Sequence, residues 1–398
     1  MKKILISLLF ILLIAGQVQA ENLFTLSLQQ PATGINDSRG FSSALDLLNT
    51  YSDGSLSNVF INYDDTKASD GYVNFRGVDM SMHFTDTIAN VVTLTISVPG
   101  INVSETFSGA SQEDAFRQFK DYLQSNKDDL LKKILAYSVS KTPYDAVAGN
   151  PNSLMNNMNN QSFSRAGGNV FGSFVSFLGP AATRHTFDYQ GQKTNADVYC
   201  LPLGYTFNFA NDRALMLDLP LMYTNMENTK TYAAQLGLGL KIPLTEYWRL
   251  IPGARAGAVF SEDLFSGGVL YECSLSSNFQ IPVDKWIFGM TNMAAYAGNI
   301  SVKVGGYELG YDLQNWIWKN GVQASYSLTK LWDVGVKYIY TKYTGSELFI
   351  DGYHTIGASV LYRVNNLWLV SGVALNCNFM FADNYKASRI GVDILFKQ

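Results

Sequence analysis

Strict alternation of apolar and polar residues runs through the second half of the chain, from about residue 181 onward. Between residues 213 and 223, leucine occupies every second position from Leu215 to Leu221, and Asp218 lies between them. Because successive side chains of a strand point to opposite faces, this period predicts strands with one apolar and one polar face. The apolar face continues for about ten residues per strand, which is the length that a tilted strand needs to cross a bilayer.

Short polar turns divide this region into hairpins. Five of them stand out: Ala210-Asn211-Asp212, Thr245-Glu246-Tyr247, Val283-Asp284-Lys285, Thr329-Lys330-Leu331 and Val364-Asn365-Asn366. Five inner turns imply six hairpins, and the strands are predicted at 181–190, 196–209, 213–224, 231–242, 248–260, 267–281, 286–297, 316–328, 332–343, 348–363, 367–380 and 387–397. We expect a bulge within 367–380, where alternation is less clean, and either a long outer loop or strand extensions at 298–315. The prediction is an all-β transmembrane barrel of about 12 antiparallel strands.

A tryptophan follows four of the five turns, directly after three of them and one residue later after the last. Trp248, Trp286, Trp332 and Trp368 are separated by 38, 46 and 36 residues, which is roughly the length of one hairpin. A ring of amphipathic side chains at one end of successive hairpins is typical of the aromatic girdle of a membrane barrel. The alternative is a soluble β protein with core tryptophans at strand starts, which the long apolar faces disfavour.

Residues 21–148 show a different pattern, which predicts a small α+β domain before the barrel. We expect a helix at 41–51 and strands at 58–63, 78–84, 92–98 and 101–107. Ser111, with Asp114 three residues later, resembles a capping box and predicts the start of a helix. A second apolar stripe follows at 130–135, and Pro143 ends it. No catalytic or ligand-binding motif is apparent in this domain.

The segment 149–180 is predicted to connect the two parts. Residues 149–168 are polar and rich in asparagine, which is typical of a linker. The next apolar residues are spaced as one face of a short amphipathic helix: Val170, Phe171, Phe174, Val175 and Leu178. This segment is expected either to pack beside the second domain, or to lie at a membrane surface or inside a pore.

The chain begins with the features of a secretory signal peptide. Lys2 and Lys3 precede an apolar run at 4–16, and Ala20 follows as a small residue at the expected cleavage site. The run of about 13 residues is too short to span a membrane as a helix. We therefore expect residues 1–20 to be removed on export.

Composition supports an exported strand-rich protein. Among 398 residues, 16% are charged, 13% are aromatic and 47% are hydrophobic, and the mean hydropathy is +0.01. Low charge and many aromatic residues exclude a disordered chain, and average hydropathy disfavours a bundle of membrane helices. A formal net charge of −4 gives no support for nucleic-acid binding.

The final strand resembles the C-terminal assembly signal of Gram-negative outer-membrane proteins. That signal consists of a polar residue, then a glycine, then two apolar residues, the last of which is usually aromatic. Here Arg389, Gly391, Ile394 and Phe396 match it in that order. Lys397 and Gln398 extend beyond the aromatic residue, which departs from the usual ending. The resemblance implies location in the outer membrane, contact with its lipids, and insertion by the outer-membrane assembly machinery.

The overall organisation also resembles an autotransporter translocator. An exported N-terminal domain, a short segment and about 220 residues of barrel follow one another in that order. In that family the segment is a linker helix that threads the pore, and the N-terminal domain reaches the cell surface. The first domain here lacks the long repetitive strands of a typical passenger.

Residues suited to catalysis or to metal binding are few. Cys200, Cys273 and Cys377 are far apart, and we interpret them as isolated apolar residues. His185 and His354 share strand parity with apolar neighbours, which predicts that both face outward. No phosphate loop or metal-ligand spacing is apparent, so no cofactor, metal or catalytic residue is predicted and an enzyme is not favoured. An outer-membrane hydrolase remains one alternative.

The polar face of the strands is where a function would reside. Its charged residues predict a polar lumen: Asp218, Lys241, Arg249, Arg255, Glu272, Lys319, Asp333, Lys337, Arg389 and Asp393. Opposite charges can line a narrow channel or pair and close it. We expect a membrane anchor or small-solute channel with a periplasmic N-terminal domain. The alternative is an autotransporter-like barrel that displays this domain at the cell surface. The partner of the first domain is not identified by the sequence.

Overall fold

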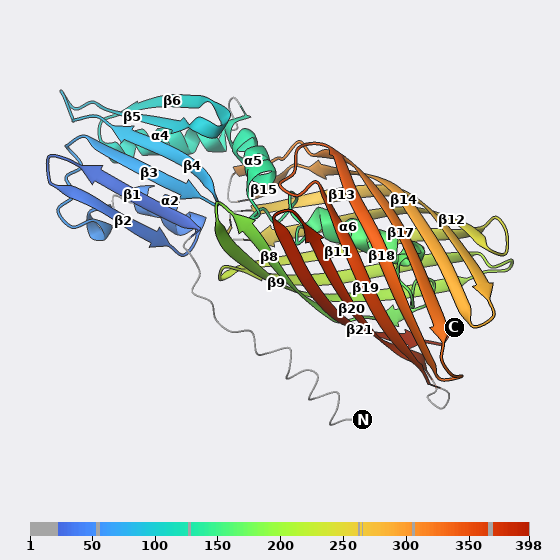
Figure 1. Ribbon diagram of the computed structural model, residues 1–398. Coiled ribbons are helices and arrows are strands. Elements are labelled where there is room, and N and C mark those ends of the chain that lie inside the picture. The colour runs from blue at the N-terminus through green and yellow to red at the C-terminus, as the bar shows by residue number, and fades with distance from the viewer. Residues whose placement is uncertain are drawn as a thin grey trace.

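The computed structural model describes residues 23–52, 56–125, 129–261, 263–264, 266–304, 307–364 and 369–397. The predicted signal peptide and Trp368 lie outside these residues. The described chain forms a six-stranded sheet with helices, followed by a closed barrel of twelve strands (Figure 1). The predicted fold class is therefore confirmed.

The N-terminal sheet is antiparallel and has the strand order β2-β1-β3-β4-β5-β6. Its strands are β1 (Phe24–Gln30), β2 (Ile35–Phe41), β3 (Ser69–Phe75), β4 (Val78–Phe84), β5 (Val92–Val98) and β6 (Val103–Gly109). Strict alternation predicted β4 and β5 at their observed bounds. The prediction missed β1, β2 and β3, which carry charged, amide or glycine residues on their exposed faces.

Helices pack beside this sheet: α2 (Ala44–Ser52), α3 (Leu56–Val59), α4 (Gln112–Gln124) and α5 (Leu130–Lys141). The Ser111 side chain accepts a hydrogen bond from the Asp114 N–H at 3.1 Å, which confirms the predicted start of α4. The strand predicted at 58–63 is wrong. The Phe60 N–H closes a helical turn onto Leu56 O, and Ile61 is exposed. No helix in the described parts of the chain is both long and apolar enough to cross a bilayer.

Twelve strands form the barrel wall: β8 (Ala181–Tyr189), β9 (Gln192–Asn208), β10 (Ala214–Met226), β11 (Thr229–Pro243), β12 (Trp248–Ser261), β13 (Ser266–Val283), β14 (Trp286–Ile300), β17 (Gln314–Ser327), β18 (Trp332–Gly345), β19 (Gly352–Arg363), β20 (Val370–Ala382) and β21 (Tyr385–Phe396). Each pairs antiparallel with its neighbour, and β21 pairs with β8 from Tyr385–Phe187 to Gly391–Ala181. This last pairing closes the sheet, so the predicted strand count is confirmed.

The connections differ at the two ends of the barrel. The end that carries the five predicted turns is called the turn end, and Asn211, Asp212 and Asp284 adopt positive φ there. At the opposite end, which we call the loop end, two-residue turns join β8 to β9, β10 to β11 and β20 to β21. The longest connection is also at the loop end, where residues 298–315 include a small hairpin of β15 (Val302–Val304) and β16 (Tyr307–Leu309). The bulge expected in the eleventh strand is present as a register shift between Val370 and Gly372.

The two faces of the barrel wall differ sharply in polarity. Outward side chains are large and apolar, and Leu236 and Val336 are each 58% exposed. Neighbouring inward side chains are polar and buried. Gln235, for example, is 3% exposed and Glu272 is 1% exposed. A soluble barrel would place its apolar face inside, so this arrangement is that of a barrel whose outer face meets lipid.

The N-terminal domain sits on the loop end, far from the C-terminus (Figure 1). The Phe349 N–H donates to Val139 O at 3.0 Å, and the Ile350 N–H donates to Gly149 O at 2.9 Å. The Tyr189 hydroxyl of β8 donates to Gly77 O at 3.0 Å. Apolar residues of both parts form one continuous core, so the domain and the barrel are packed together.

A buried ion pair lies at this junction. Arg76 Nη1, from the β3–β4 turn, is 3.4 Å from Asp145 Oδ2, and neither side chain is exposed. Asp145 Oδ1 also accepts the N–H groups of Val147 (2.8 Å) and Ala148 (3.3 Å). Burial raises the pKa of Asp145, although the charge of Arg76 acts in the opposite direction. The pair joins the first domain to the segment that enters the barrel.

Replacing Arg76 with methionine should destabilise the folded protein, because Asp145 would keep a buried charge without its partner. Breaking a buried pair in this way costs about 3–5 kcal/mol. The measurement is the denaturant midpoint of the purified protein in detergent. Arg39→Met is the matched control, because Arg39 and Asp37 form a half-exposed pair whose loss should cost under about 1 kcal/mol. Equal losses in the two variants would contradict this account.

Candidate functional site in the barrel lumen

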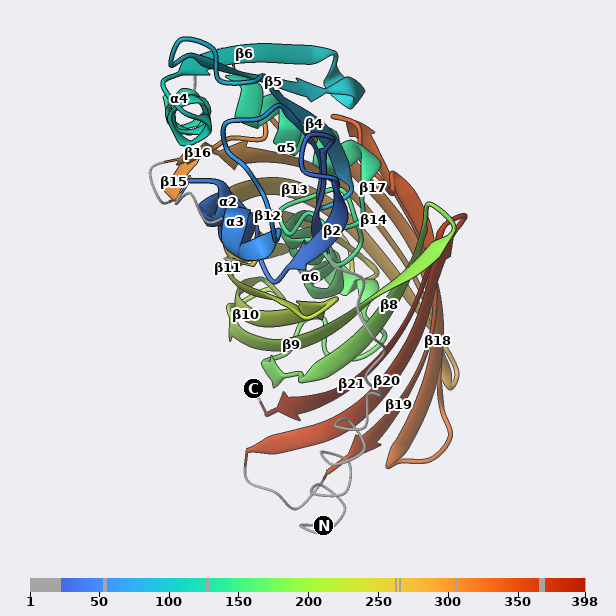
Figure 2. The same cartoon turned by 90° about the vertical axis from the view of Figure 1, so that its left-hand side faces the viewer.

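A helix occupies the interior of the barrel. Helix α6 (Leu154–Phe163) and the π-helical turn η3 (Ser164–Gly168) lie inside the ring of strands (Figure 2). We call residues 154–168 the plug segment. The sequence predicted a linker here, but nearly all of these side chains are buried. The difference arises because the surrounding lumen is polar, so a helix buried in it carries polar residues.

Local hydrogen bonds fix the start of the plug segment. The Asn150 side-chain amide donates to Pro143 O (2.9 Å) and Asp145 O (2.7 Å), which folds the chain into a compact turn. The Leu154 N–H then donates to Ala146 O at 2.9 Å. Ser153 caps the helix by accepting the N–H of Asn156, as serine commonly does at this position.

Near the loop end, asparagines of α6 contact two wall tyrosines. Asn156 Oδ1 accepts hydrogen bonds from the hydroxyls of Tyr343 on β18 and Tyr353 on β19, each at 2.7 Å. Asn159 Nδ2 donates to the Tyr343 hydroxyl at 2.8 Å. Buried amides are costly unless they are hydrogen-bonded, and these contacts supply their partners.

At mid-height, charged wall residues meet the plug segment. Arg255 Nη1 is 2.6 Å from Asp218 Oδ2, and the two side chains are 2% and 3% exposed. Arg255 Nε donates to the Ser162 hydroxyl at 3.2 Å, and this hydroxyl donates to Glu272 Oε1 at 2.5 Å. On the facing wall, Lys319 donates to Asn160 Oδ1. The structure therefore brings three of the predicted lumen residues, Arg255, Glu272 and Lys319, into contact with α6, and Asp218 supports Arg255.

The turn end of the lumen is closed by the chain after η3. Arg165 donates to the carbonyls of Ser173 (3.0 Å) and Val175 (2.8 Å) and to Thr206 Oγ1 (2.9 Å). The helix predicted at 170–178 is wrong. These carbonyls bond to Arg165, and Gly172 has a φ of 88°, so the chain forms bends. It ends in β7 (Phe177–Leu178), which pairs with β9 and β21.

The other predicted lumen residues lie in two groups. At the turn end, Asp212 forms ion pairs with Lys241 (2.6 Å) and Arg249 (3.5 Å), and Asp333 pairs with Arg363 at 2.7 Å. Lys337, Arg389 and Asp393 line a polar cavity beside the plug segment. None of these residues is assembled into a constellation that resembles a known active site.

The sequence reading missed the side chains of the plug segment itself: Asn156, Asn159, Asn160, Ser162 and Arg165. A signal was nevertheless present. Ser153 is a good helix cap, and no glycine or proline interrupts residues 154–166. Leu154, Met155 and Met158 are spaced as one helical face.

The two barrel histidines, His185 and His354, lie in different surroundings. His185 was predicted to face outward, which is wrong. It is 3% exposed, stacks against Phe187 and lies 3.0 Å from the Tyr385 hydroxyl. Phe187, two residues later on the same face of β8, is also buried. The apolar face of β8 therefore points into the core and not toward lipid. His354 Nδ1 is 2.7 Å from the hydroxyl of Tyr338. Among the described residues, no three His, Cys, Asp or Glu side chains are placed to bind a metal.

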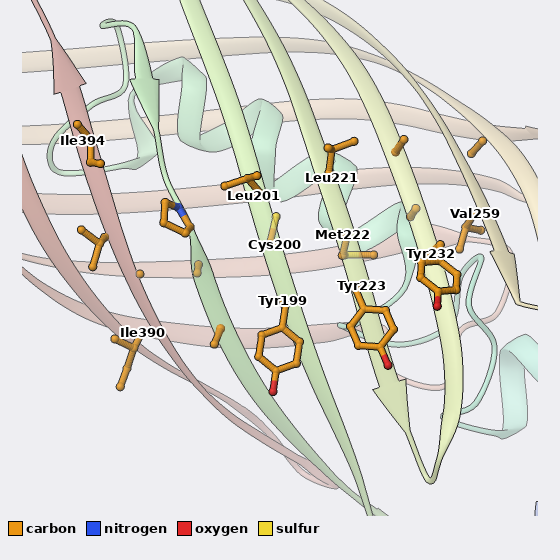
Figure 3. Close-up of a pocket in the computed structure, with 18 of the residues that line it drawn as sticks. Tyr199, Cys200, Leu201, Leu221, Met222, Tyr223, Tyr232, Val259, Ile390 and Ile394 are labelled. Carbon is orange, nitrogen blue, oxygen red and sulfur yellow. The ribbon is translucent and has the colours of Figure 1, made fainter. Parts of the chain in front are cut away.

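The outer wall carries an apolar groove across the closing strands. It has a volume of about 1210 Å³ and extends from β20 and β21 across β8 to β12. Figure 3 shows Tyr199, Tyr223 and Tyr232 with their hydroxyls pointing the same way, beside Leu201 and Leu221. The groove belongs to the lipid-facing surface.

Comparison with known proteins gives structural likenesses alone. No protein-family model and no curated protein matches the chain. Among solved structures, the translocator domain of the autotransporter NalP from Neisseria meningitidis has a TM-score of 0.45 at 10% identity, covering 60% of this chain and 94% of its own. An outer-membrane channel from Pseudomonas putida has a TM-score of 0.40 at 13% identity, covering 56% and 96%. The KdgM porin has a TM-score of 0.34 at 11% identity, covering 55% and 99%.

Replacing Asp218 with alanine should weaken the barrel, because the buried Arg255 would lose its direct ion-pair partner. The expected loss is about 3–5 kcal/mol, measured from the temperature at which the compact form is lost in a detergent gel. Asp351→Ala is the control, since Asp351 and Lys342 form an exposed pair worth under about 1 kcal/mol. An unchanged transition in Asp218→Ala would show that the pair does not stabilise the barrel.

Proposed function

We propose that this protein is an outer-membrane barrel that displays its N-terminal domain at the cell surface while the plug segment closes its lumen. The observation that carries the proposal is the path of the chain. The domain lies on the loop end, and the plug segment runs through the lumen. The chain then reaches the turn end at Phe174, beside Lys241 and Arg249, before β8 begins in mid-wall opposite Cys200. An apolar outer face supports a position in lipid.

The orientation follows from strand number and loop length. An even number of strands brings the start of β8 and the end of β21 to the same end of the barrel. In bacterial barrels the longer loops face outward. The longest connection between barrel strands, 301–313, is at the loop end, together with three two-residue turns. The turn end would then be periplasmic, and the N-terminal domain would lie outside the cell. This favours display over the periplasmic location that the sequence first suggested.

Aromatic side chains support the proposed position of the barrel in the membrane. Trp248, Trp286 and Trp332 are the first residues of β12, β14 and β18 and are 42–44% exposed. The exposed Trp316 and the partly buried Tyr296 form an edge-to-face pair nearer the loop end. Two such bands would mark the two membrane interfaces. Insertion by the outer-membrane assembly machinery, with β21 as the recognised strand, is part of the proposal.

A small-solute channel is the second candidate function, and the lumen contacts weigh against it. Asn156, Asn159, Ser162 and Arg165 all bond to the wall or to the chain that closes the turn end. A solute would have to displace these bonds. We therefore treat the closed lumen as the resting state.

Protease added to intact cells should cut the N-terminal domain. A protease site inserted in the exposed turn at 64–67 would be cleaved without lysis, and the barrel fragment would stay in the membrane. The measurement is immunoblotting of both fragments, with a periplasmic protein as the integrity control. Cleavage only after permeabilisation would contradict display.

Planar-bilayer recordings should show little conductance for the intact protein. Replacing residues 154–168 with a glycine-serine segment of equal length removes the wall contacts and should open steady channels. A variant with substitutions only at exposed Ile61 and Ile88 serves as the control. Equal conductance before and after replacement of the plug segment would contradict a closed lumen.

A further inference from the structure

A polar cavity of about 100 Å³ lies between the plug segment and the wall formed by β18 to β21. One water needs about 10–15 Å³ of such space, so the cavity has room for a larger occupant. Three cationic side chains line it: Lys319, Lys337 and Arg389. Among its lining residues the single carboxylate is Asp393.

The register of the strands aligns two of these cations. Lys337 on β18 pairs with Gly357 on β19, Gly357 pairs with Asn378 on β20, and Asn378 pairs with Arg389 on β21. A Cβ atom at Gly357 would lie 2.8 Å from Lys337 Cε and 2.4 Å from Asn378 Oδ1. The glycine therefore leaves the space through which Lys337 reaches over β19 toward Asn378, which Arg389 flanks on the other side.

The charges of this cavity are not balanced by the protein. Asp393 Oδ2 already accepts hydrogen bonds from Asn376 (2.7 Å) and Asn169 (3.2 Å). Lys337 and Arg389 form no hydrogen bond or ion pair with any residue that the structure describes, and Asn378 Oδ1 is buried without a partner there. Lys337 and Arg389 are partly buried and share Asp393 as their nearby opposite charge. The cavity therefore keeps a net positive charge that an anion would neutralise.

We propose that this cavity binds a small oxyanion, such as phosphate, between Lys337 and Arg389. The planar guanidinium of Arg389 can present two parallel N–H groups to an oxyanion, and Lys337 adds a point charge. Rotating the amide of Asn378 by half a turn would offer a further donor. Asn160, Gln161 and Ser164 of the plug segment line the same cavity, so the anion would hold the plug segment against the wall. This inference does not depend on which side of the membrane the N-terminal domain occupies.

The test uses the full-length protein in detergent, with inorganic phosphate as the probe. Phosphate replaces chloride at constant ionic strength, and the midpoint of thermal unfolding is followed. The midpoint should rise saturably by several degrees, because a ligand that binds only the folded state stabilises it. Lys337→Gln should weaken the apparent affinity at least tenfold and flatten this response. Lys241→Gln, which removes a lumen cation already paired with Asp212, should retain the full response.

A phosphate response that is the same in Lys337→Gln as in the original protein would overturn the proposal. Equal unfolding midpoints in phosphate and in chloride would also overturn the proposal. Any effect of salt would then come from general screening of charges and not from binding of phosphate. Arg389→Gln provides a second variant, and calorimetric titration of phosphate into each protein measures binding directly. Loss of heat release in Lys337→Gln, with retention in Lys241→Gln, is the expected result.

Discussion

The closure of the sheet is the constraint on which the rest of the structure depends. In hydrocarbon no water can satisfy the N–H and C=O groups of a free strand edge, so a membrane sheet must close on itself. Here β21 pairs with β8 from Tyr385–Phe187 to Gly391–Ala181, and β7 continues the wall where β8 is too short. Once the sheet is closed, every second side chain points outward and the others point into a confined interior.

The polarity of each face follows from this geometry. Outward residues such as Leu236 and Val336 remain exposed because their solvent is lipid. Inward residues such as Arg255 and Glu272 would be hydrated if the lumen were empty. Because the lumen is filled by protein, these side chains need hydrogen-bond partners within it. The plug segment supplies these partners through Ser162, whose hydroxyl connects both side chains. Low overall charge and average hydropathy are the summed result of one apolar and one polar face.

The barrel was predictable because its signal is periodic and local. Polar turns and alternation located all twelve strands, and the register shift in β20 appeared where alternation weakened. The autotransporter resemblance implied a helix in the pore, but the residue pattern did not assign it to 154–168. A buried helix is usually recognised from its apolar residues, and many residues of this helix are polar. Asn156 bonds to Tyr343 and Tyr353, nearly 200 residues away, and no local pattern reveals such contacts. The outward prediction for His185 failed for a related reason. Near the loop end the inner face of the wall is apolar, so alternation with apolar residues there does not mark the lipid-facing side.

The position of the plug segment in the lumen is the central claim, and site-specific photocrosslinking tests it directly. Phe163 of α6 lies so close to β17 that a Cβ atom at Gly321 would be 2.9 Å from Phe163 Cζ. With p-benzoylphenylalanine in place of Phe163, irradiation of living cells should give an intramolecular crosslink within 314–327, identified by mass spectrometry. Crosslinks to other proteins, without any to β17, would show that α6 lies outside the barrel and would contradict this account.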